Sequence, residues 1–273
     1  MLVLVGPPWA GTDEDYARLA RAAGLVAYDL RARLNPHSWG VVRALAEASQ
    51  AEALAGQLSA AGFRACVVDP RVGVDPARPL VTVRGLELTD EQLVLHLSER
   101  SIPVPTRGLV VVVRGEVQLG SRSAPSRSSS SSAFRAVAPS AADIQLFRES
   151  VASGQFDAYA AADIHFATVA WGARIDARAF DFSSLGLGSD SPAQNLDEVV
   201  EVLSGRVGVR VDRGGRTSSI LSYLSGPARS ATPVPGQGLH RPPPGTTDER
   251  FDAYSRIVAE AERRTRGWSG AAG

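Results

Sequence analysis

Residues 2–24 read LVLVGPPWAGTDEDYARLARAAG and hold the clearest change of secondary-structure pattern in the chain. The four apolar residues 2–5 form a short continuous run typical of a buried strand. Gly-Pro-Pro ends this run, and Thr12 followed by three acidic residues is typical of a helix N-terminus. Apolar residues then recur at helical spacing until Gly24, a usual helix stop. A strand followed directly by an amphipathic helix predicts a mixed α/β fold.

The residues that follow continue the alternation of helix and strand. The pattern predicts a second short helix over residues 26–34, a strand over 39–45, a helix capped by Ser49 and a closing strand over 65–68. Cys66, between apolar neighbours on that last strand, is expected to be buried and inert. Residues 1–69 therefore predict one small folded unit.

The order of these elements resembles a known family. The successive stretches AGLVAYDLRARL, SWGVVRAL and EASQAEALAGQLSAAGFRACVV, between residues 24 and 68, resemble the C-terminal domain of the bacterial ribosomal stalk protein and the related Clp-protease adaptor fold. The resemblance implies an open α/β sandwich that binds other proteins. The Lys-rich face of the stalk family is missing, so a ribosomal role is not implied. The contact surface is expected near Tyr28, Arg31 and Trp39.

Changes in composition predict the domain organisation. An adaptor-like domain extended by a small antiparallel β unit is expected over residues 1–118, and a Ser-rich linker over 119–140. A smaller α/β region is expected over 141–216, a Pro/Gly-rich connector over 217–247 and an amphipathic helix over 248–267. The predicted class is therefore α/β in the broad α+β sense, with two folded regions.

Composition excludes several classes of function. All 29 basic residues are Arg, against 29 acidic residues, so Schiff-base chemistry and a complete P-loop are excluded. A single cysteine excludes a disulfide within the chain and a cysteine-built zinc site. No apolar run approaches the length of a membrane span. We expect a cytoplasmic protein without a metal, a cofactor or a membrane contact.

The densest polar cluster lies at residues 163–178. On a strand, Asp163 and His165 would project from one face, and Asp176 and Arg178 would share a face of the next strand. Such a cluster suits the acid/base chemistry of a hydrolase or transferase. The same residues could also form a His/Asp metal site. The alternative is a strand pair joined by Arg–Asp contacts, and we favour it because a single His without a second nitrogen ligand nearby is weak evidence for a metal.

The favoured function is a non-catalytic protein-interaction or regulatory module with an unknown protein partner. Besides the residues near Tyr28, the predicted C-terminal helix offers Phe251, Tyr254 and Ile257 at helical spacing, so it could dock into a groove of its own chain or of another. A third hypothesis is nucleic-acid binding by the basic C-terminal part, through four arginines that recur every three or four residues: Arg206, Arg210, Arg213 and Arg216.

Overall fold

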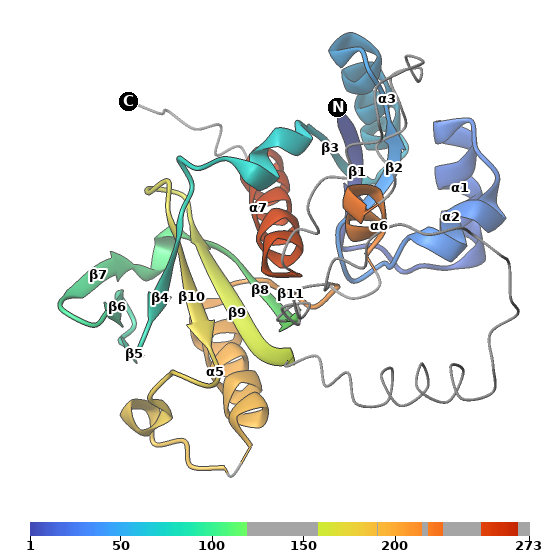
Figure 1. The fold of residues 1–273 in the computed structure, drawn as a ribbon. Helices are drawn as coiled ribbons and strands as arrows, with labels where there is room; N and C mark the ends of the chain where they lie inside the picture. Colours follow the sequence, from blue (N-terminus) through green and yellow to red (C-terminus); the bar gives the residue numbers. More distant parts are fainter. Residues whose placement is uncertain (119–157, 190, 215–217, 226–246, 267–273) are drawn as a thin grey trace, which may run out of the picture.

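The computed structural model describes residues 1–118, 158–189, 191–214, 218–225 and 247–266. Helices and strands are mixed throughout, in three sheets, so the predicted α/β class is confirmed (Figure 1). The predicted linker, the start of the region that follows it and most of the predicted Pro/Gly-rich connector lie outside the described residues.

The N-terminal sheet has the order β2-β1-β3, with both neighbours antiparallel to the central strand. Its strands are β1 (Leu2–Gly6), β2 (Gly40–Ala44) and β3 (Arg64–Val68). One face packs against α1 (Asp13–Ala23), α2 (Ala27–Arg33) and α3 (Ala48–Ala60) through a shared apolar cluster. A 3-10 turn, η1 (Pro70–Val74), leads out of this unit.

Local signals at α1 act as the sequence predicts. The Asp15 N–H donates to Thr12 Oγ1 at 3.2 Å, and the Thr12 N–H donates to Asp15 Oδ2 at 3.3 Å, which together form a capping box. Gly24 ends the helix in the left-handed region with φ of 60°. The prediction for the third helix is wrong in one detail, because α3 begins one residue after Glu47 and has no side-chain cap from Ser49.

The central sheet has the order β11-β8-β9-β10-β4. Its strands are β4 (Leu80–Val83), β8 (Leu109–Gln118), β9 (Ala158–Phe166), β10 (Gly172–Asp176) and β11 (Val211–Asp212). The two longest strands, β8 and β9, are antiparallel and pair along their whole lengths. β4 and β11 add parallel strands at the two edges.

This pairing corrects the predicted domain boundaries. β8 closes the predicted domain 1–118 and β9 lies in the predicted region 141–216, yet they are neighbours in one sheet. The low-complexity residues 119–140 therefore lie between two paired strands and do not separate two folded regions. The small antiparallel β unit predicted at the end of the domain 1–118 is also divided, because β4 and β8 belong to the central sheet and the strands between them form another sheet.

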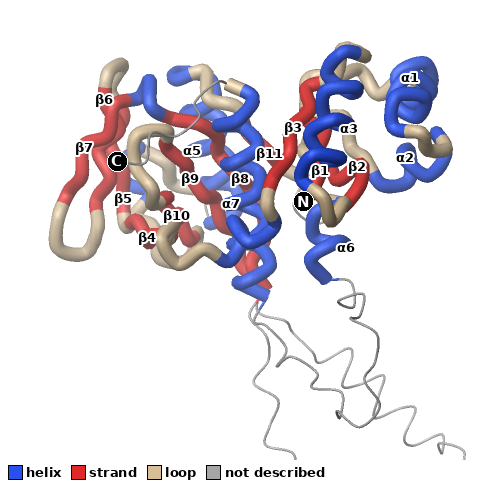
Figure 2. The backbone as a smooth tube through the Cα atoms, turned by 90° about the horizontal axis from the view of Figure 1, so that it is seen from above, coloured by secondary structure: helices blue, strands red, loops and turns tan. Residues whose placement is uncertain are grey.

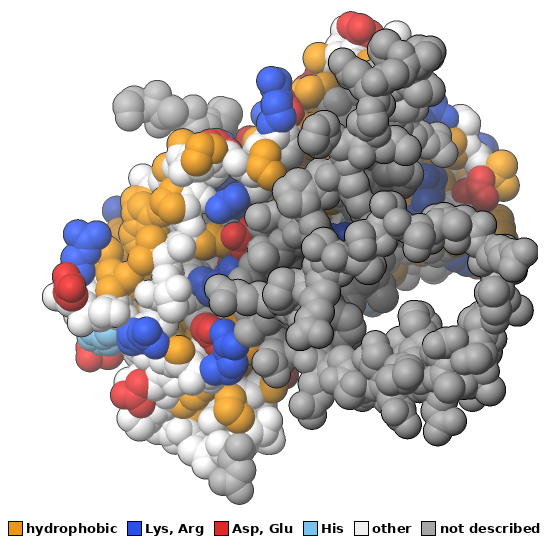
Figure 3. Space-filling view, viewed as in Figure 1, with side chains coloured by type: hydrophobic (Ala, Val, Ile, Leu, Met, Phe, Trp, Pro, Cys, Tyr) orange, Lys and Arg blue, Asp and Glu red, His pale blue; other side chains and the backbone are white. Residues whose placement is uncertain are grey.

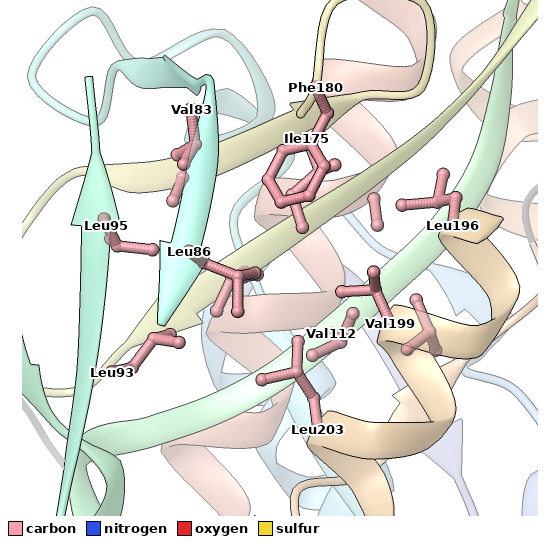
Figure 4. Packing of buried hydrophobic residues seen from close by; sticks show 14 of the residues in the cluster. Val83, Leu86, Leu93, Leu95, Val112, Ile175, Phe180, Leu196, Val199 and Leu203 are labelled. Carbon is pink, nitrogen blue, oxygen red and sulfur yellow. The ribbon is translucent and has the colours of Figure 1, made fainter. Parts of the chain in front are cut away.

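That small sheet consists of β5 (Gly85–Leu88), β6 (Gln92–His96) and β7 (Ser101–Pro105), followed by the turn η2 (Thr106–Gly108). Its inner face and helix α5 (Pro192–Val207) cover the same side of the central sheet, together with the turn η3 (Phe182–Leu185). Figure 4 shows the apolar side chains that meet there, from Leu86 and Leu95 on the small sheet to Leu196 and Leu203 on α5.

Helix α7 (Thr247–Thr265) lies between the N-terminal and central sheets (Figures 1 and 2). One apolar cluster joins its buried face to β1 and β3 on one side and to β8 on the other. The short helix α6 (Ser219–Ser225) packs beside it. The fold is thus a series of layers: helices, N-terminal sheet, α7, central sheet, and finally α5 with the small sheet.

Candidate functional site

The polar cluster predicted on the central sheet lies on the face that meets α7. Asp163 and His165 are two residues apart on β9, so they project from the same face, as predicted. Arg174 lies directly opposite Asp163 on β10. Figure 3 shows basic and acidic side chains alternating on the surface over β9 and β10. The question is therefore whether these groups are available for chemistry.

Asp163 is fully buried and held by Arg174 through two hydrogen bonds. Arg174 Nε donates to Asp163 Oδ1 at 2.7 Å and Nη2 donates to Oδ2 at 2.8 Å. The same Nη2 lies 2.6 Å from Asp252 Oδ1 on α7. The guanidinium also packs over the Phe251 ring, 5.1 Å from its centroid. Arg174 on β10 thus bridges two carboxylates and joins β9 to α7.

His165 is sealed inside the same interface. Its side chain is hydrogen-bonded through Nε2 to Ser255 Oγ of α7 at 2.7 Å, and the residue is only 3% exposed. Burial lowers the pKa of His165 to about 3, and nearby arginines such as Arg263 lower it further against the opposing charge of Asp163. The imidazole is therefore neutral at physiological pH and has no access to a substrate.

Asp176 and Arg178 form a separate pair at the end of β10. Arg178 Nη2 donates to Asp176 Oδ2 at 2.7 Å, and its guanidinium lies 3.5 Å from the centroid of the Tyr159 ring. Burial alone would raise the pKa of Asp176, but the hydrogen bonds and charge of Arg178 outweigh it and lower that pKa. Each predicted acid is thus already paired with an arginine.

These contacts support the structural alternative for the cluster. Both oxygens of Asp163 accept hydrogen bonds from Arg174, so proton transfer there would first break a buried ion pair. Within the described part of the chain, no three His, Cys, Asp or Glu side chains are placed to bind a metal ion. The cluster holds α7 against the central sheet, and its Asp163 and His165 are already hydrogen-bonded within the interface.

The structure corrects the predicted binding surface in two places. Phe251, Tyr254 and Ile257 on α7 are buried against the chain's own sheets, so they are not exposed to a partner. The predicted helix docks within its own chain, which was one of the two alternatives. Trp39 is also fully buried, beneath the arginine Arg64, whose guanidinium lies 5.3 Å from the centroid of the indole ring.

Trp39 and the end of α7 form a buried polar junction between the N-terminal sheet and the central sheet. Trp39 Nε1 donates to Glu262 Oε1 at 2.8 Å, and Arg64 Nη2 donates to Glu262 Oε2 at 2.7 Å. Arg210, which precedes β11, pairs with the same carboxylate, and its Nη2 lies 3.0 Å from Asp212 Oδ2. Burial raises the pKa of Glu262, but Arg210, Arg64 and Trp39 outweigh it and lower that pKa. The junction is closed and fully paired.

The other two predicted contact residues are exposed on α2. Tyr28 is 79% exposed and Val26, directly before the helix, is 62% exposed, while Leu30 anchors the helix in the core. Arg31 pairs with Asp13 of α1. We call Val26, Tyr28 and Arg31 the α2 surface.

The comparisons with known proteins give no family for this chain. No family model, curated protein or solved structure matches it. The resemblance of residues 24–68 to the stalk and adaptor folds therefore stays a prediction from the sequence. Among the described residues, no helix has both the length and the apolar character needed to cross a membrane.

The arginines predicted to bind nucleic acid have different environments. Arg210 is engaged in the junction with Glu262, and Arg213 pairs with Glu201. Arg206 is exposed near the end of α5, and the fourth, Arg216, lies outside the described residues. Arg206, Arg210 and Arg213 therefore do not form a continuous basic surface.

The sequence did not reveal the partners that complete the cluster. Arg174 belongs to the polar cluster predicted at residues 163–178, and the Arg–Asp contact was the favoured interpretation there. Asp252 and Ser255 reach the cluster from α7, about 90 residues later. Asp252 and Ser255 lie between the apolar positions of that helix, and an amphipathic pattern predicts that such polar positions are exposed to solvent. Because sheets cover α7 on both sides, polar positions such as Ser255 are buried as well as its apolar ones.

Proposed function

We propose that this chain is a protein-binding module that engages its partner through the α2 surface. The observation behind the proposal is the exposure of Tyr28 and Val26, which are among the most exposed large apolar side chains of the described residues. Aromatic and arginine side chains contribute much of the binding energy at protein interfaces. The proposal includes a cytoplasmic location, for which the lone thiol of Cys66 gives general support.

The α2 surface is presented on a fixed support. Leu30 and Leu34 are buried, and the Tyr16 hydroxyl donates to the Leu34 carbonyl oxygen at 3.0 Å. Arg31 lies over the Tyr16 ring, 5.2 Å from its centroid. Because the backbone beneath Tyr28 is anchored in this way, a partner pays little ordering entropy on this side of the interface.

The alternatives receive less support from the described contacts. The acid/base cluster is closed by Arg174 and α7, so the hydrolase hypothesis based on Asp163 and His165 has no open site. Two of the arginines considered for nucleic-acid binding are occupied by carboxylates of this chain. Among the described residues no element covers Tyr28 and Val26 of the α2 surface, although Arg31 is paired with Asp13.

The experiment compares the full-length protein with two tyrosine variants. A partner is first isolated on the tagged wild-type chain from extracts of the producing cells, identified, purified and titrated against the bait. We expect Tyr28→Ala to raise the dissociation constant at least about tenfold, a loss of affinity typical of a hot-spot residue. Tyr223→Ala, which removes an exposed tyrosine on α6, should leave it unchanged. Equal effects of both substitutions, or none from Tyr28→Ala, would overturn the proposal.

A further inference from the structure

Three polar side chains lie close together on the outer face of the small sheet. His96 on β6 is opposite Ser101 on β7 and is opposite Gly85 on β5, two residues before Glu87. His96 Nδ1 is 2.7 Å from Ser101 Oγ, and His96 Nε2 is 3.1 Å from Glu87 Oε1. We call Glu87, His96 and Ser101 the surface triad.

When the His96 imidazole is neutral, the chemistry of the three groups sets the direction of both hydrogen bonds. An ionised carboxylate can only accept, so Nε2 of His96 carries the hydrogen and its N–H donates a hydrogen bond to Glu87 Oε1. Nδ1 is then the unprotonated nitrogen and accepts from the Ser101 hydroxyl. A hydroxyl that donates to an imidazole oriented by a carboxylate is the arrangement that activates serine as a nucleophile.

The register of the small sheet explains why the side chains meet. The Leu97 N–H donates to the Arg100 carbonyl oxygen at 2.8 Å, so the next pair outward, His96 and Ser101, is a non-hydrogen-bonded pair. Side chains approach most closely at such pairs. The Ser101 N–H then points away from β6, towards the open edge of the sheet. It is the natural donor to a negative oxygen that forms beside Oγ.

Exposure distinguishes this triad from the buried histidine of the central sheet. His165 and Ser255 also form a hydrogen-bonded pair, but both are sealed beneath α7. The His96 side chain is 31% exposed, and Glu87 is more exposed still. Val94 and Pro103 lie on the same outer face, one row along, and offer apolar contact. The surface suits a small carboxylic ester that arrives from solvent.

We propose that Ser101 is an acyl acceptor in the hydrolysis of small carboxylic esters. Ser101 Oγ forms a bond to the carbonyl carbon while His96 Nδ1 takes the hydroxyl proton, and the alcohol leaves as its bond to that carbon breaks, with the proton from His96. Water then attacks the acyl-serine, His96 accepts a proton from the water, and this proton returns to Ser101 Oγ as the carboxylic acid is released. Glu87 positions the imidazole throughout.

This activity is independent of the proposed binding function. The small sheet and the α2 surface lie at opposite ends of the layers, as Figure 2 shows for β6 and β7 on one side and α2 on the other. A variant of the surface triad therefore leaves the α2 surface intact.

The experiment mixes the full-length protein with excess p-nitrophenyl acetate. We expect a burst of about one p-nitrophenolate per chain and an acetyl group on the peptide that contains Ser101. Ser101→Ala should abolish both, and His96→Gln should slow the burst on the order of 100-fold, the usual contribution of a general base. Glu87→Gln should slow it less. His37→Gln, which removes an exposed loop histidine, should leave the burst unchanged and corrects for uncatalysed reaction with surface imidazoles.

The result that would overturn the proposal is equally direct. A wild-type chain without a burst, a burst that survives Ser101→Ala, or acetyl groups found only on other residues would each show that the surface triad is a cross-strand hydrogen-bond network without nucleophilic activity. Because the three side chains are at least partly exposed, the variants should keep the wild-type circular dichroism spectrum, and this measurement accompanies each kinetic trace.

Discussion

Asp163 and Arg174 show how a charged pair on a strand can serve structure alone. Removing one partner of a buried ion pair leaves an uncompensated charge and costs about 3 to 5 kcal/mol. We therefore expect Asp163→Asn to lower the free energy of unfolding by that amount in urea titrations. Glu201→Gln, which breaks the exposed pair with Arg213, should cost only about 0 to 1 kcal/mol. Similar losses for the two variants would show that the buried pair is not structural.

The buried His165 should make the free energy of unfolding depend on pH. Its pKa is about 3 in the folded protein because of burial, against about 6.5 in an unfolded chain. As the pH falls below 6.5, the unfolded chain binds a proton that the folded protein does not, so stability is lost at about 1.4 kcal/mol per pH unit. Between pH 7.5 and 5, the wild type should lose about 2 kcal/mol more than His165→Gln. Parallel losses in urea titrations would contradict this assignment.

Helix α7 approaches strand β8 so closely at Gly115 that the residue there must have no side chain. A Cβ at Gly115 on β8 would overlap the Phe251 ring of α7, so the helix fits only against glycine. Gly115→Ala should cost about 1 to 3 kcal/mol in thermal or urea unfolding, the usual penalty for overpacking. Gly56→Ala is the matched control, because Gly56 lies in α3 and a Cβ there meets nothing within 4 Å. It should raise stability by up to about 1 kcal/mol, and a neutral Gly115→Ala would refute the packing argument.

Elements with local signals could be predicted from the sequence, and those defined by distant partners could not. Thr12 and Gly24 bound α1 through contacts within one helical turn, so their residue types suffice. The sequence places β4 and β8 in one small antiparallel unit, but in the structure they pair with β10 and β9. The same limit applies to the candidate site. The shared face of Asp163 and His165 follows from strand periodicity, whereas Ser255 depends on how α7 docks.

At the scale of the whole molecule, α7 joins two halves that composition alone separates. Its buried face contacts β3 and β8, and its charged residues pair across both sheets through Arg174 and Glu262. Serine-rich and proline-rich segments suggest boundaries because they contain few large apolar residues, yet a chain can leave a sheet and return to the adjacent strand. The proposed functional surfaces are consequently the outer ones, at α2 and on the small sheet.

The central claim is that the N-terminal and central sheets fold as one cooperative body around α7. Native-state hydrogen exchange across a urea series tests it directly, because it reports the free energy of opening for each strand. We predict that the slowest amides of β1, β9 and α7 share one opening free energy and one dependence on urea. If the amides of β1 exchanged at urea concentrations where those of β9 and α7 stayed protected, the two sheets would be independent units and the claim would be wrong.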